Sequence, residues 1–243
     1  MAALVGLTTV CGAAAAPTAF TLQFAGAHIA DTSLTAGIRH EGRFTAAPPL
    51  CPSGTAVDIQ DVEIEPLTVM RRHTCDDGSG SFVAFMPSVL SEHGGTGTWK
   101  IIDGTGKYAT LRGVGTYSGH IVSGDPARFD TVVYTTSWQG VVDFDDVAPA
   151  LTTTAQAKRL RKPARTYLVR TTIDAHEESV TYSVDIRAGR SFLALMKGTA
   201  ASGETTSSAR IRAPRLTRAV KVIVLVSDSV GNETTTTLQV KLR

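Results

Sequence analysis

The chain has 243 residues, of which 42% are hydrophobic and 19% are charged. This balance is typical of a folded globular protein and excludes a disordered or collagen-like chain. After the first 19 residues, no segment approaches the ~18 consecutive apolar residues that a membrane-spanning helix needs. The length suffices for one large domain or two ordinary ones, each with its own core.

The formal charge of +2 hides two halves of opposite sign. Residues 20–148 carry eight Lys or Arg and 15 Asp or Glu, a formal charge of −7. Residues 149–243 carry 16 Lys or Arg and seven Asp or Glu, a formal charge of +9. This contrast predicts two domains, 20–146 and 147–243, that meet near the segment Asp145 to Pro149.

The first 19 residues are predicted to be a signal peptide, because an apolar run precedes small residues and Ala13-x-Ala15 offers a cleavage site. The usual positive start is missing, and an alanine-rich disordered tail or a first strand is the alternative. The signal peptide indicates a secreted or cell-surface protein.

Two cysteines remain after that leader, Cys51 and Cys75. An even pair in an exported chain favours a disulfide, which would stabilise the fold by about 3 kcal/mol in the chain-entropy model. Two buried free thiols are the alternative. A catalytic thiol is disfavoured, since no histidine stands where it would activate one.

The first half reads as a series of short strands with no helical periodicity. Phe20 to Phe24 alternates apolar and polar residues, the period of a half-buried strand. Further strand candidates are residues 37–45, 56–65, 67–70, 81–86, 115–122 and 129–144, and residues 71–75 run into the turn that begins at Asp76. Pro87 to His93 is expected to form one helical turn. Many short strands with glycine-rich turns predict an all-β sandwich or barrel.

Glycines punctuate the stretch from Gly94 to Tyr117, in the order G-T-W-x-I-x-x-G-T-G-x-Y-A-x-L-x-G-x-G-x-Y. Glycine within strands marks bulges, sharp bends or close backbone approach, which curved antiparallel sheets require. The order resembles the small closed, calycin-like barrels of the allene oxide cyclase-like group, relatives of the dirigent proteins. The resemblance covers roughly residues 20–146 and includes the segments that begin at Cys51, Cys75 and Trp138. It looks closest to secreted bacterial members, in which paired cysteines staple the barrel.

An eight-stranded barrel is filled by side chains or holds one small ligand. Interior candidates are Phe20, Leu22, Phe24, Trp99, Tyr134 and Trp138, of which Trp99, Tyr134 and Trp138 are the binding candidates. The same residues would serve equally as plain core.

The second half shows about seven strand-like segments, among them Tyr167 to Ile173, Val180 to Ile186 and Ala219 to Val226. Seven strands suit an immunoglobulin-like sandwich. The turn Asp228 to Asn232 resembles the D-x-x-G-N turn that precedes the last strand of bacterial Ig-like domains. No cysteine lies in this half, so the antibody-type disulfide is absent.

Chemical motifs are weak throughout. Gly104 to Ala109 formally matches a dinucleotide fingerprint, but that motif must open a helix, and strand follows here. We therefore predict no cofactor, no metal and no assigned catalytic residue. His73, Glu92 and His93 are polar candidates for a site, because barrel strands could bring His73 and His93 together.

Basic residues concentrate in the second half, in Lys158 to Arg165 and again at Arg210, Arg212, Arg215 and Arg218. Few aromatic residues accompany them, which disfavours nucleic acid. An anionic cell-surface polymer is a candidate partner, and a simply solvated face is the alternative.

Three functions are compatible with this sequence. The first is a non-enzymatic exported protein, with a stapled barrel able to bind a small apolar ligand and an Ig-like spacer or adhesion module. The second is an isomerase or cyclase acting on an apolar substrate inside the barrel, as the resemblance to the plant enzymes implies. The third is a cell-surface protein that docks anionic polymers through its basic half.

Overall fold

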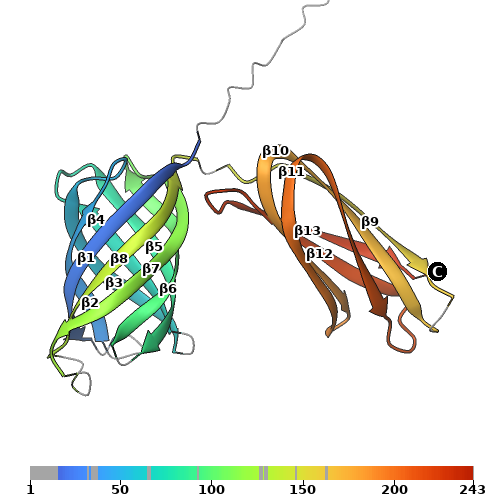
Figure 1. Cartoon of the computed structure of the whole chain (residues 1–243), viewed down its shortest axis with the longest axis horizontal. Coiled ribbons are helices and arrows are strands. Elements are labelled where there is room, and N and C mark those ends of the chain that lie inside the picture. The colour runs from blue at the N-terminus through green and yellow to red at the C-terminus, as the bar shows by residue number, and fades with distance from the viewer. Residues whose placement is uncertain are drawn as a thin grey trace, which may run out of the picture.

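The computed structural model describes residues 16–242, except for residues 32, 34–37, 65–66, 92, 126–127, 129–130, 146 and 162–163. Every long regular element in this part of the chain is a β-strand, so the fold is all-β (Figure 1). The predicted signal peptide falls mostly on residues 1–15, outside the described residues. Among the described residues, no helix is long and apolar enough to span a membrane.

The first eight strands form a closed antiparallel barrel in which each strand pairs with its neighbour in sequence. The barrel closes because β1 pairs with β2 on one edge and with β8 on the other, with Leu22 opposite both Ala46 and Trp138. The strands are β1 (Thr18–Ala30), β2 (Ile38–Ala46), β3 (Ser53–Ile64), β4 (Leu67–Cys75), β5 (Gly80–Ser91), β6 (Gly94–Gly106), β7 (Arg112–Ser123) and β8 (Val133–Asp143).

Alternation along these strands sends every second side chain inward, as the pleat requires. In β1, Phe20, Leu22 and Phe24 are buried while their neighbours in sequence are exposed. Trp99 of β6 and Trp138 of β8 are buried in the same core. The interior candidates named from the sequence therefore lie inside the barrel.

Residues 87–91 continue strand β5, so the expected helical turn from Pro87 to His93 is wrong. Proline is tolerated here because it lies where the described β5–β6 pairing skips from Phe85 to Ser88, while Thr68 of β4 lies opposite Pro87 on the other side. The strand context overrides the local turn signal.

A disulfide joins Cys51, just before β3, to Cys75 at the end of β4, as the sequence predicted. Both cysteines are buried, with Leu50 and Tyr108 in the same core. The connections β2–β3, β4–β5 and β6–β7 leave from this end of the barrel. The disulfide therefore staples one end of the barrel, which we call the disulfide end.

Five further strands form a second sheet with a separate hydrophobic core. They are β9 (Leu151–Arg159), β10 (Thr166–Ala188), β11 (Ser191–Arg212), β12 (Ala219–Ser227) and β13 (Glu233–Lys241). On the edge of β10 opposite β11, β9 pairs with the first half of β10 and β12 with the second half. Strand β10 bends between these halves, at a register shift from Ala175 to Ser179. The sheet folds over, so that both halves enclose one core and β9 contacts β13.

The expected seven strands of this region are five, because two pairs of predicted strands are continuous. Residues 167–173 and 180–186 are the two halves of β10, and residues 192–195 and 208–211 lie near the two ends of β11. The bend in β10 is an irregularity from Ala175 to Ser179, after which pairing with β11 resumes without a turn.

The two cores are joined by few described contacts. The side chain of Asn232 donates to the carbonyl of Asp145, and that of Thr234 donates to the carbonyl of Pro149. Lys100 of the barrel forms an ion pair with Glu233 of β13, at 3.0 Å. The domain boundary near residue 147 stays a prediction, with which the separate cores agree.

Candidate functional site

Strand pairing gathers polar side chains at the barrel end opposite the disulfide, which we call the polar end. Asp58 of β3 lies opposite Arg71 of β4, and His28 of β1 lies opposite His40 of β2. Tyr134 of β8 lies opposite Gly26 of β1. The connections β1–β2, β3–β4, β5–β6 and β7–β8 leave from this end.

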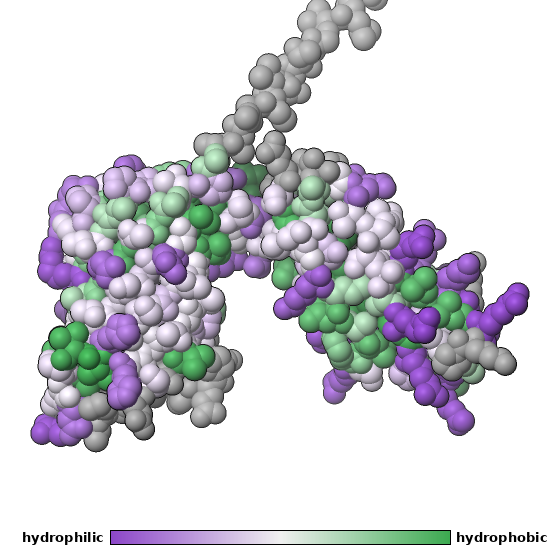
Figure 2. All heavy atoms as spheres, in the orientation of Figure 1, coloured by the Kyte–Doolittle hydropathy of each residue, from purple (hydrophilic) through white to green (hydrophobic). Residues whose placement is uncertain are grey.

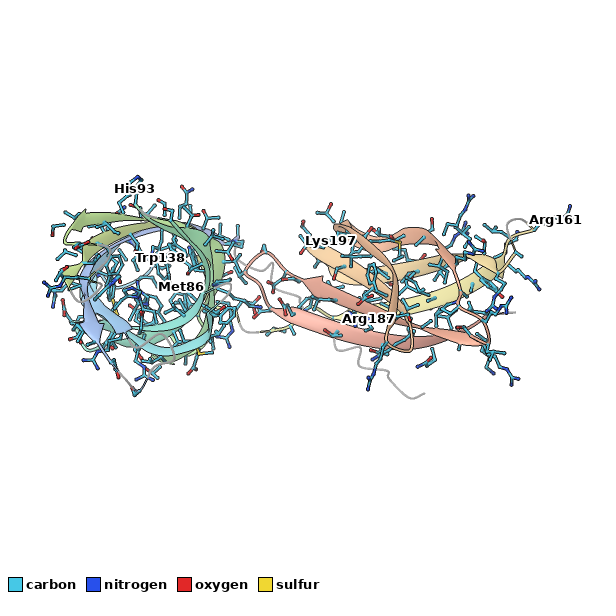
Figure 3. All side chains as sticks on the ribbon, turned by 90° about the horizontal axis from the view of Figure 1, so that it is seen from below. Met86, His93, Trp138, Arg161, Arg187 and Lys197 are labelled. Carbon is cyan, nitrogen blue, oxygen red and sulfur yellow. A yellow bond between two sulfur atoms is a disulfide. The ribbon has the colours of Figure 1, made fainter. Side chains whose placement is uncertain are left out.

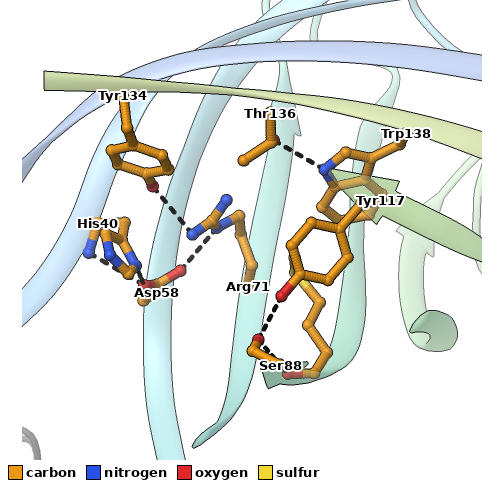
Figure 4. Close-up of polar contacts among 9 residues, drawn as sticks. His40, Asp58, Arg71, Ser88, Tyr117, Tyr134, Thr136 and Trp138 are labelled. Carbon is orange, nitrogen blue, oxygen red and sulfur yellow. Dashed lines mark hydrogen bonds and ion pairs between the residues drawn. The ribbon is translucent and has the colours of Figure 1, made fainter. Parts of the chain in front are cut away.

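An ion pair between Asp58 and Arg71 forms the centre of the polar end (Figure 4). Arg71 Nε donates to Asp58 Oδ1 at 2.6 Å, and each side chain is only 3% exposed. The other carboxylate oxygen, Oδ2, accepts from the backbone N–H of His40 at 3.0 Å and contacts His40 Nδ1. Both oxygens of the buried carboxylate are therefore satisfied.

The charges of this pair hold each other ionised. Burial would raise the pKa of Asp58, but the Arg71 cation and the His40 hydrogen bond outweigh it and hold that pKa well below 3.8. Burial would likewise lower the pKa of Arg71, and the Asp58 carboxylate raises it above its ordinary value. A charged pair thus sits in the barrel interior.

Aromatic rings surround the guanidinium of Arg71. It lies 4.5 Å from the ring centroid of Phe24, a cation–π contact. Its Nη2 donates to the hydroxyl of Tyr134 at 3.1 Å. Its Nη1 has no hydrogen-bond partner among the described residues, although Arg71 is 2% exposed. The Nη1 group of Arg71 is therefore a strong donor inside the barrel that has no acceptor in the described part of the chain.

Two tyrosines line the interior beside Arg71. Burial raises the pKa of Tyr134, so its phenol stays neutral across the physiological range. Burial also raises the pKa of Tyr117, whose hydroxyl contacts Ser88 Oγ. Near them, Trp138 Nε1 donates to Thr136 Oγ1 at 2.9 Å.

Two histidine rings lie at the edge of this cluster. The rings of His28 and His40 are 4.3 Å apart between centroids, and both contact the ring of Tyr134. The side chain of His40 is 15% exposed, against 3% for Asp58. His40 is therefore the member of the ion-pair cluster that solvent reaches most easily.

Packed rings fill the barrel between the polar end and the disulfide end. Trp99 stacks on Trp138 with centroids 5.6 Å apart, and Phe20 meets Trp99 edge to face at 5.3 Å. His73 stacks on Phe82 at 4.6 Å, and neither nitrogen of its ring has a hydrogen-bond partner. Burial, assisted by the nearby Arg71 cation, lowers the pKa of His73 to about 3.

The residues predicted for a site are spread over the barrel. Trp99, Tyr134 and Trp138 lie inside, and Tyr134 alone contacts Arg71 directly (Figures 3 and 4). His73 is buried among rings, whereas His93 is exposed in the β5–β6 connection. His73 lies opposite Phe82, and Ser91 lies nine positions further along β5, roughly 30 Å of strand. The structure does not bring His73 and His93 together, and Glu92 lies outside the described residues.

Sequence reasoning missed His40, Asp58 and Arg71. The available signal was the spacing of two residues along each strand. Asp58 shares the inward face with Ala56, and Arg71 shares it with Val69 and His73. A charge in phase with buried residues on each of two neighbouring strands indicates an internal ion pair. In isolation each of these strands reads as one with a solvated face.

Other site types have less support in the described part of the chain. No group of three or more His, Cys, Asp or Glu side chains there could hold a metal ion. An open depression of about 550 Å³ lies over β1, β7 and β8 on the outside of the barrel, and no ionisable residue lines it. The polar end remains the candidate site.

Comparison of the chain with protein-family models, with curated proteins and with solved structures found no match. What the structure defines is a class of architecture, an all-β protein with an eight-stranded antiparallel barrel and a second β-sheet.

Proposed function

We propose that this is an exported binding protein whose barrel holds one small, largely apolar ligand at the polar end. The ligand presents an oxygen acceptor to Arg71. The observation that carries this proposal is the free Nη1 of a guanidinium that is 2% exposed. A buried donor without a partner costs about 1–3 kcal/mol, and more when it is charged, so an acceptor at this position would stabilise the barrel.

Charge balance selects the kind of acceptor. Asp58 already neutralises Arg71, so a neutral carbonyl or hydroxyl oxygen satisfies Nη1 without adding an uncompensated charge. The rings of Phe24 and Tyr134 offer apolar contact beside that donor. Because stacked rings occupy the interior below, the ligand is compact, on the scale of one substituted ring.

Native mass spectrometry of the secreted, unreduced protein tests this proposal. We expect a mass excess that disappears on denaturation and yields one small molecule. Arg71→Lys keeps a cation beside Asp58 but removes Nη1, so we expect this variant to lose the ligand. Arg72→Lys, the exposed neighbour on the same strand, is the matched control and keeps it. A bare wild-type mass, or equal retention by both variants, would contradict the proposal.

Export and the role of the second sheet belong to the same proposal. The buried disulfide supports an oxidising compartment, and cleavage after Ala15 would give a mature chain that starts at Ala16. The folded-over sheet acts as an Ig-like spacer or adhesion module in this view. Its turn supports the assignment, because Asp228 Oδ1 accepts from the backbone N–H groups of Val230 and Asn232. The mass of the secreted protein tests the cleavage site directly.

An isomerase or cyclase is the second candidate, and the His40–Asp58 contact favours it. A carboxylate that holds Nδ1 leaves Nε2 as the proton acceptor, the arrangement of an oriented general base. The molecule released from the barrel is itself the probe. Conversion into an isomer of equal mass by the wild type, and not by His40→Gln, would support catalysis. Recovery of the molecule unchanged would leave binding as the function.

A further inference from the structure

Three segments of the second sheet meet at one of its ends. The backbone N–H of Leu160 donates to Thr166 at 2.8 Å, and that of Ala213 donates to Arg165 at 3.1 Å. The backbone N–H of Leu242 donates to Arg218 at 2.8 Å. We call the described residues of 158–166, 210–218 and 241–242 the basic end.

Cations dominate the basic end without any acidic partner. These three stretches of sequence contain no Asp or Glu. The described cations are Lys158, Arg159, Arg161, Arg165, Arg210, Arg212, Arg215, Arg218 and Lys241, all of them exposed except the half-buried Arg165.

None of these cations forms an ion pair with a described residue, in contrast to Arg187, which pairs with Asp185 at 2.6 Å. Arg165 instead contacts the carbonyl oxygen of Pro214 and ties two segments together. Figure 2 shows hydrophilic side chains projecting from this side of the second sheet, and Figure 3 places Arg161 at its extremity.

Strand geometry spaces several of these charges regularly. Arg210 and Arg212 are two residues apart on β11, so they share the outer face about 7 Å apart. Lys158 and Arg210 lie opposite Leu168 from its two sides, in one row across three strands. A repeated array of charges suits a partner that itself carries repeated charges.

The basic end faces away from the connection to the barrel. Strand β9 begins at Leu151, next to Pro149, and ends at Arg159, a run of roughly 25 Å. The turn that contacts Asp145 and Pro149 lies at the start of β13, whereas Lys241 lies at its end. A polymer could therefore reach the basic end without meeting the connection.

This arrangement costs stability. Like charges in proximity repel and destabilise the compact state, and Arg212, Arg215 and Arg218 are exposed. Arginine forks bind carboxylate and phosphate oxygens in pairs, which lysine cannot match. Seven of the nine cations are arginines.

We infer that the basic end binds a linear polyanion whose repeating units carry phosphate or carboxylate groups. No Trp, Tyr or Phe occurs in its three stretches, so it has neither base-stacking rings nor the aromatic anchors typical of a membrane interface. Recognition is electrostatic and sequence-independent. This inference concerns the second sheet alone and is independent of the ligand proposed for the barrel.

Titration of the full-length protein with inorganic polyphosphate at several salt concentrations tests the inference, with poly-glutamate as the carboxylate arm. We expect the logarithm of affinity to fall linearly with the logarithm of salt concentration. In the triple variant Arg212→Gln/Arg215→Gln/Arg218→Gln, the slope should drop by about two, from roughly 0.7 per lost contact on a single-stranded polyanion. All three side chains are exposed, so the variant should fold.

The control variant Arg72→Gln/Lys107→Gln/Lys197→Gln removes the same charge from exposed positions outside the basic end. It should keep the wild-type slope. An equal loss in both triple variants would show a net-charge effect and would overturn the inference. So would binding that ignores salt, or binding to vesicles of phosphatidylcholine and phosphatidylglycerol with none to either polymer. Binding to polyphosphate alone would identify phosphate as the group that the basic end recognises, and binding to poly-glutamate alone would identify carboxylate.

Discussion

Arg71 places a permanent positive charge among aromatic rings inside the barrel. Its partner Asp58 is the only described carboxylate with which it pairs, and both side chains are 3% exposed. Removing one member leaves an uncompensated buried charge, which costs more than removing both. The pair therefore behaves as a unit.

We predict that Arg71→Met lowers the free energy of unfolding by about 3–5 kcal/mol, because Asp58 then keeps its charge without a partner. The double variant Asp58→Asn/Arg71→Met should be more stable than Arg71→Met alone. Urea unfolding of both single variants, the double variant and the wild type measures the coupling. Additive effects would show that the two side chains act independently.

His73 is predicted to make stability fall as acid is added. Its pKa is about 3 in the folded barrel, against about 6.5 when unfolded. Between these values the unfolded chain binds the extra proton, so stability decreases as pH falls from about 6.5 to 3, by up to about 1.4 kcal/mol per pH unit.

Substitution of His73 by Phe should remove that slope. It should also raise stability at neutral pH by about 1 kcal/mol, since two unpaired ring nitrogens leave the core. Thermal unfolding across this pH range measures both effects, with the exposed His120→Phe as control. A variant that keeps the wild-type pH profile would refute this account of His73.

At the scale of elements, glycine in β7 lets a tryptophan lie flat against the barrel wall. A Cβ built on Gly115 would lie 2.5 Å from Trp99 Cζ2 and 2.1 Å from the carbonyl oxygen of Gln139. Neither distance is compatible with van der Waals contact. The glycine order that suggested a curved sheet therefore has a specific role here, since the bulk of Trp99 replaces the missing side chain.

Gly115→Ala should therefore destabilise the barrel by about 2 kcal/mol through overpacking. The neighbouring Thr116 is exposed on the outer face, so Thr116→Ala should change stability by less than about 0.5 kcal/mol. Denaturant midpoints at equal slopes compare the two variants. Equal midpoints would mean that the strands around Gly115 accommodate the added methyl group without loss of stability.

Much of the barrel could be predicted from the sequence, because its signals are local. Alternation places Phe20, Leu22 and Phe24 on one face, and the two cysteines left after the predicted leader indicate a disulfide. The polar end could not be predicted in the same way. A charged residue in an alternating strand normally faces solvent, and Asp58 faces inward because Arg71 pairs with it across the ladder. The sequence also did not predict that β10 is one strand, because its two halves are separated only by an irregularity from Ala175 to Ser179, after which pairing with β11 resumes.

At the scale of the whole molecule, two cores are linked by a few polar contacts. The ion pair between Lys100 and Glu233 joins a half-buried lysine to an exposed carboxylate near the surface, a type worth about 1 kcal/mol or less. The other described links include hydrogen bonds from Asn232 and Thr234 to backbone carbonyls near the connection, and Gly231 lies close to the side chain of Val114. Such contacts are too few to make the two cores unfold as one.

We therefore predict two thermal transitions in calorimetry. Reduction of the bond between Cys51 and Cys75 should lower only the barrel transition, at a cost of about 3 kcal/mol. The double variant Cys51→Ser/Cys75→Ser should reproduce this effect without reductant. A single transition that shifts as a whole would show that the two cores are strongly coupled.

The closure of the barrel also determines how it responds to mechanical force. Thr18 at the start of β1 pairs with Val142 near the end of β8, so the chain enters and leaves the barrel at the same end of one seam. Tension between these points peels the seam open one hydrogen bond at a time. In the second sheet, Leu151 and Lys241 lie at opposite ends, so the same tension shears many hydrogen bonds together. A molecule stretched between its first strand and its basic end would therefore open its barrel before its second sheet.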